Sequence, residues 1–211
     1  AIKNNEFELY YQPKISFQTK EILGAEALIR WNHPDNGLVT PTSFIPIAEE
    51  VGLITQIDEW GLSEACRQNK LWQSKGYKPI RVSVNMSQAQ LYQTDVIASR
   101  RGALEHTGLD PQYLEVELTE TMAIQDIEHT VKILERIHEM GVSISMDDFG
   151  TGYSSLSSLK ILAINLLKID KSLIDDIETN DAARSIVKAI VDLGKAMNLE
   201  VLAEGVETKE Q

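Results

Sequence analysis

Two adjacent aspartates, Asp147 and Asp148, follow the alternating stretch VSISM and precede the glycine-rich and hydroxyl-rich stretch FGTGYSSL. Alternation is typical of a β-strand, so Asp147 points to one side of it, while Asp148, at the start of the turn, approaches from another angle. Like charges this close repel each other unless a cation lies between them. The pair therefore indicates a site for two metal ions about 3.5–4 Å apart, which would bind the attacking and leaving oxygens of a phosphoester.

Polar side chains recur on one face of the other predicted strands, toward their carboxyl ends. Any one of them alone would more often be a solvated charge at a strand end. In α/β barrels the carboxyl ends of the strands meet at one mouth, where the functional site lies. We therefore expect six side chains from six strands to converge there: Glu26, Asn85, Glu117, Asp147, Lys168 and Glu204.

The ligand atoms that this set offers are carboxylate and amide oxygens. Such ligands favour Mg²⁺ or Mn²⁺ over Zn²⁺. None of the four histidines stands in an HxH or HExxH pattern, and the single cysteine, Cys66, has no CxxC partner. We interpret Cys66 as a packed thiol on a helix.

The elements that position these residues alternate between period 2 and period 3.6. Strands are predicted at 7–17, 21–31, 80–87, 113–120, 142–148, 166–170 and 200–206. Helices are predicted at 42–50, 54–75, 88–107, 126–140, 153–162 and 180–198. Strict alternation after residue 80 favours parallel βα units. The short QTKE segment between the first two strands requires an antiparallel pair. The sequence thus predicts a mostly parallel α/β barrel or sheet with one reversed strand near the N-terminus.

The amino-acid composition limits the classes of protein to which this chain can belong. The 211 residues suffice for one large domain, and 43% hydrophobic with 25% charged residues is typical of a globular protein. A net charge of −12 disfavours binding to DNA or another nucleic acid. The sequence has no run of about 18 apolar residues, so no membrane segment is expected within it. A single cysteine fits a reducing compartment, which favours the cytoplasm for this domain, although the full-length protein could be membrane-anchored.

Seven blocks, in order along essentially the whole chain, resemble the EAL-domain family of bacterial cyclic-di-GMP phosphodiesterases. The blocks are YYQP (10–13), EALIRW (26–31), NMS (85–87), ELTE (117–120), DDFGTGYSSL (147–156), LLKIDKS (166–172) and AEGVE (203–207). The resemblance implies a modified (β/α)8 barrel with one antiparallel strand. It also implies divalent-metal-dependent hydrolysis of cyclic-di-GMP to linear pGpG in second-messenger signalling.

The resemblance also implies roles for the polar residues. The first ion would be held by Glu26, Asn85, Glu117 and Asp147. The second ion would be held by Asp147, Asp148 and Glu204. Lys168 would orient or activate the attacking water, with Asp148 and Glu204 as further catalytic groups. Arg30 would contact a substrate phosphate, and weaker candidates for substrate contacts are Gln12, Leu28, Asp170 and Glu207.

The glycine segment resembles the family's regulatory loop near a homodimer interface, which couples signals from partner domains to the site. Its implied members are Glu120, Phe149, Gly150, Thr151 and Gly152. The family pattern continues past AEGVE with a helix and a last strand, whereas this sequence stops at Gln211. We therefore expect residues 1–211 to form a single domain whose last strand is missing from this chain, with sensory or cyclase-type domains upstream in the full protein.

Three other functions compete with catalysis. One is a non-catalytic cyclic-di-GMP receptor, and another is a dimerisation module. Both are disfavoured because every matched metal carboxylate is intact. A third is another Mg²⁺-dependent barrel enzyme, such as an enolase-type lyase, and the DDFG block makes it less favoured.

Overall fold

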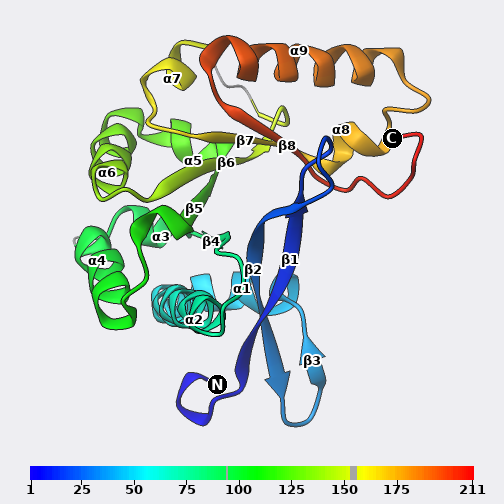
Figure 1. Ribbon diagram of the computed structural model, residues 1–211. Helices are drawn as coiled ribbons and strands as arrows, with labels where there is room; N and C mark the ends of the chain where they lie inside the picture. The colour runs from blue at the N-terminus through cyan, green and yellow to red at the C-terminus, as the bar shows by residue number, and fades with distance from the viewer. Residues whose placement is uncertain (94, 153–155) are drawn as a thin grey trace. The chain divides into compact units, whose positions relative to one another are not determined.

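The computed structural model describes residues 1–93, 95–152 and 156–211 (Figure 1). The chain forms two compact units: residues 1–116 with 140–142, and residues 117–139 with 143–211. Strand β5 (Leu114–Thr119) begins in the first unit and ends in the second.

The first unit contains the predicted antiparallel pair. Strand β1 (Phe7–Ile15) pairs with β2 (Ile22–His33), and a short strand that was not predicted, β3 (Gly37–Val39), pairs with the end of β2. Strand β4 (Arg81–Asn85) lies parallel to β2. The prediction of one reversed strand near the N-terminus is confirmed, because the connection between β1 and β2 is too short for a parallel crossover.

The helices of the first unit differ from prediction at one place. Helices α1 (Pro41–Glu50) and α2 (Ile54–Ser74) match the expected ranges. The helix predicted at 88–107 is wrong, because two helices, α3 (Gln88–Leu91) and α4 (Val96–Thr107), occupy that range. Asp95 directly precedes α4, and aspartate is favoured before a helix and disfavoured inside one. Short 3₁₀ turns also occur at Ile2–Asn4 and Pro111–Tyr113.

Two odd-numbered residues of β1, Phe7 and Tyr11, pack against aromatic side chains of this unit. The Phe7 ring lies 6.0 Å from Trp31, 5.6 Å from Phe44 and 5.7 Å from Trp60, measured between centroids. The Tyr11 ring lies 4.7 Å from that of Trp72. Because side chains alternate along a strand, the even-numbered residues of β1 point to the opposite face.

Cys66 is fully buried on α2. Burial raises the pKa of its thiol to about 12, so the thiol stays protonated at neutral pH. The interpretation of Cys66 as a packed thiol is therefore confirmed.

The second unit has parallel strands in the order β6 (Ser143–Phe149), β7 (Leu166–Ile169) and β8 (Glu200–Ala203). Helices α6 (Ile127–Glu139) and α9 (Asp181–Met197) match prediction. Helix α7 (Leu156–Ile161) lies in the range predicted at 153–162, of which 153–155 fall outside the described residues. Of the helices in the described parts of the chain, none is long and apolar enough to cross a membrane.

Two short helices of the second unit were not predicted. Helix α5 (Glu120–Gln125) begins after Thr119, whose hydroxyl accepts a hydrogen bond from the Met122 amide. Helix α8 (Lys171–Asp175) begins after Asp170, whose carboxylate accepts one from the Ser172 amide. Both N-cap residues are of types that favour a helix start, so the signal was present, but the helices are too short to show a period.

A buried polar network supports the turn after β4, which carries Asn85. The Asp58 carboxylate on α2 accepts a hydrogen bond from the Ser87 amide at 3.3 Å, and the Ser87 hydroxyl caps α3. The Arg100 guanidinium on α4 donates to the Gln90 side chain at 2.7 Å. Burial raises the pKa of Asp58 to about 6, against the opposing effects of Ser87 and the Arg100 charge.

The raised pKa of Asp58 predicts a pH dependence of stability. In the unfolded chain an aspartate titrates near pH 3.9, so between that pH and about 6 the folded protein binds more protons at this site. The contribution of Asp58 to the free energy of unfolding therefore falls as pH rises through this window. The free energy of unfolding of Asp58→Asn, taken relative to that of wild type, should therefore rise by about 2 kcal/mol from pH 4 to pH 7.

Urea unfolding at four pH values from 4 to 7 checks this expectation. The matched control is Asp35→Asn, which removes an exposed carboxylate from the same unit. If the free energies of unfolding of Asp58→Asn and wild type differ by the same amount at all four pH values, the raised pKa of Asp58 is contradicted.

Candidate active site and metal centre

A β-bulge accommodates the two adjacent aspartates inside β6, which continues to Phe149, so the expectation that Asp148 stands at the start of the turn is wrong. In the pairing of β6 with β7, Met146 lies opposite Leu167 and Phe149 lies opposite Ile169. Asp147 and Asp148 therefore both face the single residue Lys168. Asp148 has a φ of 54°, in the left-handed region that non-glycine residues rarely adopt. Such strain is characteristic of functional sites, and here it turns Asp148 away from the direction that simple alternation would give it.

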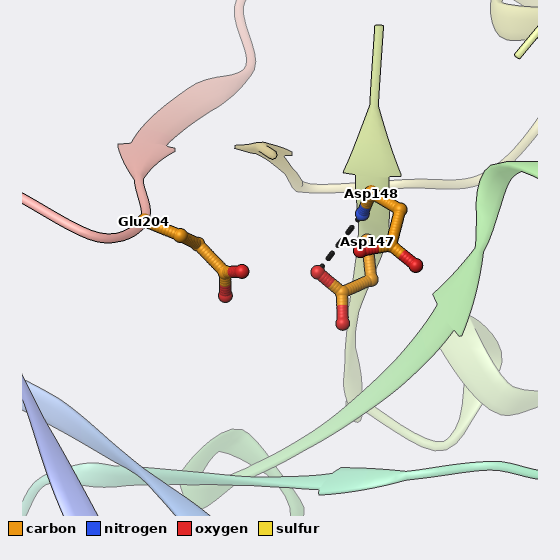
Figure 2. A group of neighbouring side chains, drawn as sticks. All are labelled: Asp147, Asp148 and Glu204. Atoms are coloured by element: carbon orange, nitrogen blue, oxygen red, sulfur yellow. Dashed lines mark hydrogen bonds between the residues drawn. The ribbon is translucent and has the colours of Figure 1, made fainter. Parts of the chain in front are cut away.

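The bulge brings together three carboxylates with the spacing of a candidate metal site. Asp147, Asp148 and Glu204 each offer a carboxylate oxygen, and these three oxygens lie within 4.8 Å of one another (Figure 2). The Asp148 amide also donates a 3.0 Å hydrogen bond to Asp147 Oδ1. Glu204 directly follows β8, where its amide is held by the carbonyl of Ile169 at 3.1 Å. Three half-buried oxygen donors fit a hard divalent cation such as Mg²⁺ or Mn²⁺.

Lys168 is the buried cation of this group. Its Nζ lies 2.6 Å from Glu117 Oε2, 2.7 Å from Glu204 Oε1 and 3.0 Å from Asp147 Oδ1. The side chains of Lys168 and Glu117 are almost completely buried, at 1% and 0% exposed. Buried charges persist only when they are paired, so the ammonium group balances the three carboxylates around it.

Burial also affects the protonation of Glu204. Desolvation raises the pKa of its carboxyl, and the charges of Asp147 and Glu117 act in the same direction. The Lys168 ammonium opposes this shift through its charge and its hydrogen bond. The protonated form of Glu204 is therefore more favoured than that of an exposed glutamate, and carboxyl groups with a shifted pKa are common at functional sites.

Glu120 contacts the backbone of the glycine segment. Its buried carboxylate accepts hydrogen bonds from the amides of Gly150 at 3.0 Å and Gly152 at 3.4 Å. Gly150 has a φ of 99°, and a Cβ on Gly152 would lie 2.6 Å from Glu120 Oε1. Both positions therefore require glycine. The Thr151 hydroxyl donates to the Asp148 carbonyl at 2.8 Å, so this segment is joined directly to the strained aspartate.

The first unit brings two of the predicted metal ligands together. Asn85 Nδ2 donates to Glu26 Oε1 at 3.0 Å. Gln12 lies opposite Glu26 in the β1–β2 register. Arg30, on the same face four register pairs further along, donates from Nη1 to the carbonyl of Ile29 at 2.8 Å. The predicted residues thus form one group in each unit: Glu26 and Asn85 in the first, and Glu117, Asp147, Asp148, Lys168 and Glu204 in the second.

The remaining substrate candidates have structural partners. Asp170 caps helix α8, and Glu207 Oε1 lies 3.2 Å from Lys171 Nζ. Leu28 is half-buried in β2, opposite Tyr10. Tyr10 itself was not predicted as a site residue, although its parity with Gln12 in the block YYQP was the signal that could have identified it.

Comparisons with known proteins support one family. The EAL domain family matches residues 1–211. MucR, the bifunctional diguanylate cyclase/cyclic di-GMP phosphodiesterase of Pseudomonas aeruginosa, is 46% identical over 211 residues, which are 100% of this chain and 31% of MucR. NbdA, a cyclic di-GMP phosphodiesterase of the same organism, is 42% identical over 211 residues, which are 100% of this chain and 27% of NbdA. The chain thus spans about a third or less of these relatives.

Solved structures agree. The PaMucR phosphodiesterase in complex with c-di-GMP has a TM-score of 0.96 and 45% identity, covering 99% of this chain and 85% of that one. The EAL enzyme Bd1971 in its cAMP- and cyclic-di-GMP-bound form has a TM-score of 0.92 and 33% identity, covering 99% and 57%. The predicted fold class, an α/β fold of modified barrel type with one antiparallel strand, is confirmed by this likeness. The chain belongs to the EAL domain family.

Proposed function

We propose that this domain hydrolyses one phosphodiester bond of cyclic-di-GMP and releases linear pGpG. The observation that carries the proposal is the group around Lys168, a buried ammonium in contact with three carboxylates beside the strained Asp148. A purely structural role would not require a left-handed aspartate at a bulge. The named activity of the relatives MucR and NbdA supports the same reaction.

The reaction requires divalent ions, and the donor set fits them. We assign the first ion to Glu26, Asn85, Glu117 and Asp147. We assign the second to Asp147, Asp148 and Glu204, the three whose oxygens lie within 4.8 Å of one another. When bound, Mg²⁺ or Mn²⁺ lowers the pKa of water and neutralises charge that develops on phosphate oxygens.

The chain's own residues supply orientation and proton transfer. Lys168 Nζ gives up one of its three carboxylate contacts, donates to the attacking water and fixes the orientation of that water. Glu204 and Asp148 act beside it as acceptors for the proton that the water loses. Arg30 offers a planar guanidinium to a non-reacting phosphate, with Gln12 and Leu28 beside it on the same strand pair. Asp170 and Glu207 would first have to release their bonds to Ser172 and Lys171 to contact substrate.

Regulation is proposed to act through the glycine segment. Glu120 and the segment Phe149, Gly150, Thr151 and Gly152 are joined by hydrogen bonds to each other and to Asp148. A change that breaks the Glu120 contacts would alter the placement of Asp148 in the donor set. We propose that a homodimer partner and further sensory or cyclase-type domains act on this segment, and that the domain works in the cytoplasm.

A hydrolysis assay tests the proposed function. The full protein is incubated with cyclic-di-GMP and Mg²⁺, Mn²⁺ or a chelator, and products are separated by chromatography. Wild type should form pGpG with either metal and none with chelator. Glu26→Ala should lower turnover at least a hundredfold, because it removes a ligand of the first ion and the partner of Asn85.

The matched control is Glu21→Ala, an exposed glutamate that contacts Lys78 and starts the same strand region. It should keep wild-type turnover. Saturable binding of cyclic-di-GMP without turnover would contradict the enzymatic function and support a receptor function. Absence of both turnover and binding would leave an interaction module.

A further inference from the structure

An exposed aromatic ring lies on the functional face of the β1–β2 pair. Residues directly opposite each other in an antiparallel pair point to the same face. Tyr10 lies opposite Leu28, between the pairs Gln12–Glu26 and Glu8–Arg30. The tyrosine is therefore on the same face as Glu26, about 7 Å further along the strands.

The two tyrosines of YYQP have different environments. Tyr11 points to the helix side and packs against Trp72. Tyr10 points away from that core, and 47% of it is exposed. One neighbour of its ring is the Arg30 guanidinium, whose central carbon lies 5.4 Å from the ring centroid. The fold thus presents an accessible aromatic ring beside a cation on the strand pair that carries Glu26.

This combination suits a nucleotide that carries both a base and a phosphate. Aromatic side chains stack on bases, and each stack strengthens binding by roughly 5- to 150-fold. A guanidinium binds a phosphate and also stacks on aromatic faces. Resting on the proposed function, we propose that Tyr10 is a base-stacking residue for one guanine of cyclic-di-GMP, while Arg30 beside it contacts a phosphate.

A different role for Tyr10 would be to hold Arg30 in place. Loss of the ring would then weaken the binding of every phosphodiester substrate to the same degree. A stacking role predicts that only substrates with a nucleobase lose affinity. Comparison of cyclic-di-GMP with its abasic analogue, the same cyclic bis-phosphodiester with hydrogen in place of each base, separates the two roles.

The test compares Tyr10→Leu and Tyr10→Phe with wild type on both substrates. Leucine keeps apolar bulk without a π face, and phenylalanine keeps the ring. The ratio of kcat/KM on cyclic-di-GMP to that on the abasic analogue should fall about tenfold or more in Tyr10→Leu, mainly through KM on cyclic-di-GMP. Tyr10→Phe should retain the wild-type ratio. An unchanged ratio in Tyr10→Leu, or an equal loss on both substrates, overturns the stacking role.

Binding of cyclic-di-GMP, measured by calorimetry in the presence of Ca²⁺, keeps this inference separable from the proposed function. If wild type binds cyclic-di-GMP but forms no pGpG with Mg²⁺ or Mn²⁺, hydrolysis is excluded, and a tenfold weaker Kd in Tyr10→Leu still supports stacking. An equal Kd in wild type and Tyr10→Leu excludes stacking. If wild type neither binds nor hydrolyses cyclic-di-GMP, both proposals are overturned.

Discussion

Replacing Lys168 with methionine is expected to lower hydrolysis of cyclic-di-GMP by about a thousandfold, within the range by which positioned acid–base groups accelerate reactions. Methionine has a similar length and no charge, so the cavity stays filled while the contacts to Glu117, Asp147 and Glu204 are lost. Single-turnover rates at saturating Mg²⁺ and substrate measure the chemical step directly.

The same substitution should destabilise the protein when no divalent ion is present. Three carboxylates would then share one site without the ammonium that balances them, and loss of a buried partner of this kind costs about 3–5 kcal/mol. A divalent ion that binds the folded state supplies the missing charge and restores stability by mass action. In thermal unfolding, the Tm of Lys168→Met should therefore be low in chelator and recover in Mg²⁺. Its hydrolysis of cyclic-di-GMP should not recover in Mg²⁺.

Two variants complete the comparison. Lys168→Arg keeps the positive charge but not the compact ammonium, so it should keep stability in chelator better than methionine does while still hydrolysing slowly. Lys188→Met removes an exposed lysine that contacts Asp192 on α9 and should behave as wild type. Hydrolysis by Lys168→Met within tenfold of wild type would exclude Lys168 from the chemical step.

The strands that carry the site were predictable from local patterns. Alternation in the segments around Glu26, Asn85, Asp147 and Lys168 identified the strands on which they lie, because the period of a strand is a property of neighbouring residues. The expected metal site at Asp147 and Asp148 was also predictable, because its signal is two carboxylates adjacent in the sequence. The left-handed backbone at Asp148 was not predictable, because it results from a bulge against β7, about twenty residues further along the chain.

Other features depend on partners that are distant in sequence. Asp58 lies within a regular helical pattern, and its contact with Ser87 arises only when α2 packs beside the end of β4. The family resemblance implied a substrate contact for Asp170, yet its carboxylate caps α8. Glu115 shares its parity with Glu117, but the two have different partners, and nothing in the local sequence distinguishes them.

Replacing Glu115 should give the largest loss of stability in the first unit. The Glu115 side chain is only 2% exposed, and its carboxylate contacts Lys14 Nζ at 2.7 Å and Arg81 Nη1 at 3.2 Å. These contacts join β1, β4 and the start of β5. Removal of one member of a buried ionic group costs about 3–5 kcal/mol, so Glu115→Ala should lower the free energy of unfolding by this amount. Glu115→Gln keeps the shape and should lose less, about 2 kcal/mol.

Urea unfolding at pH 7.5 measures both losses, and the exposed pair Glu21–Lys78 provides the control. Its contact distance is 3.0 Å, similar to those of Glu115, but both side chains are more than half exposed. Glu21→Gln should therefore cost less than about 1 kcal/mol. If Glu115→Ala costs no more than Glu21→Gln, the buried contacts contribute nothing to stability. A triple variant, Lys14→Met with Arg81→Met and Glu115→Leu, should recover much of the loss, because apolar side chains of similar volume avoid the desolvation of three charges.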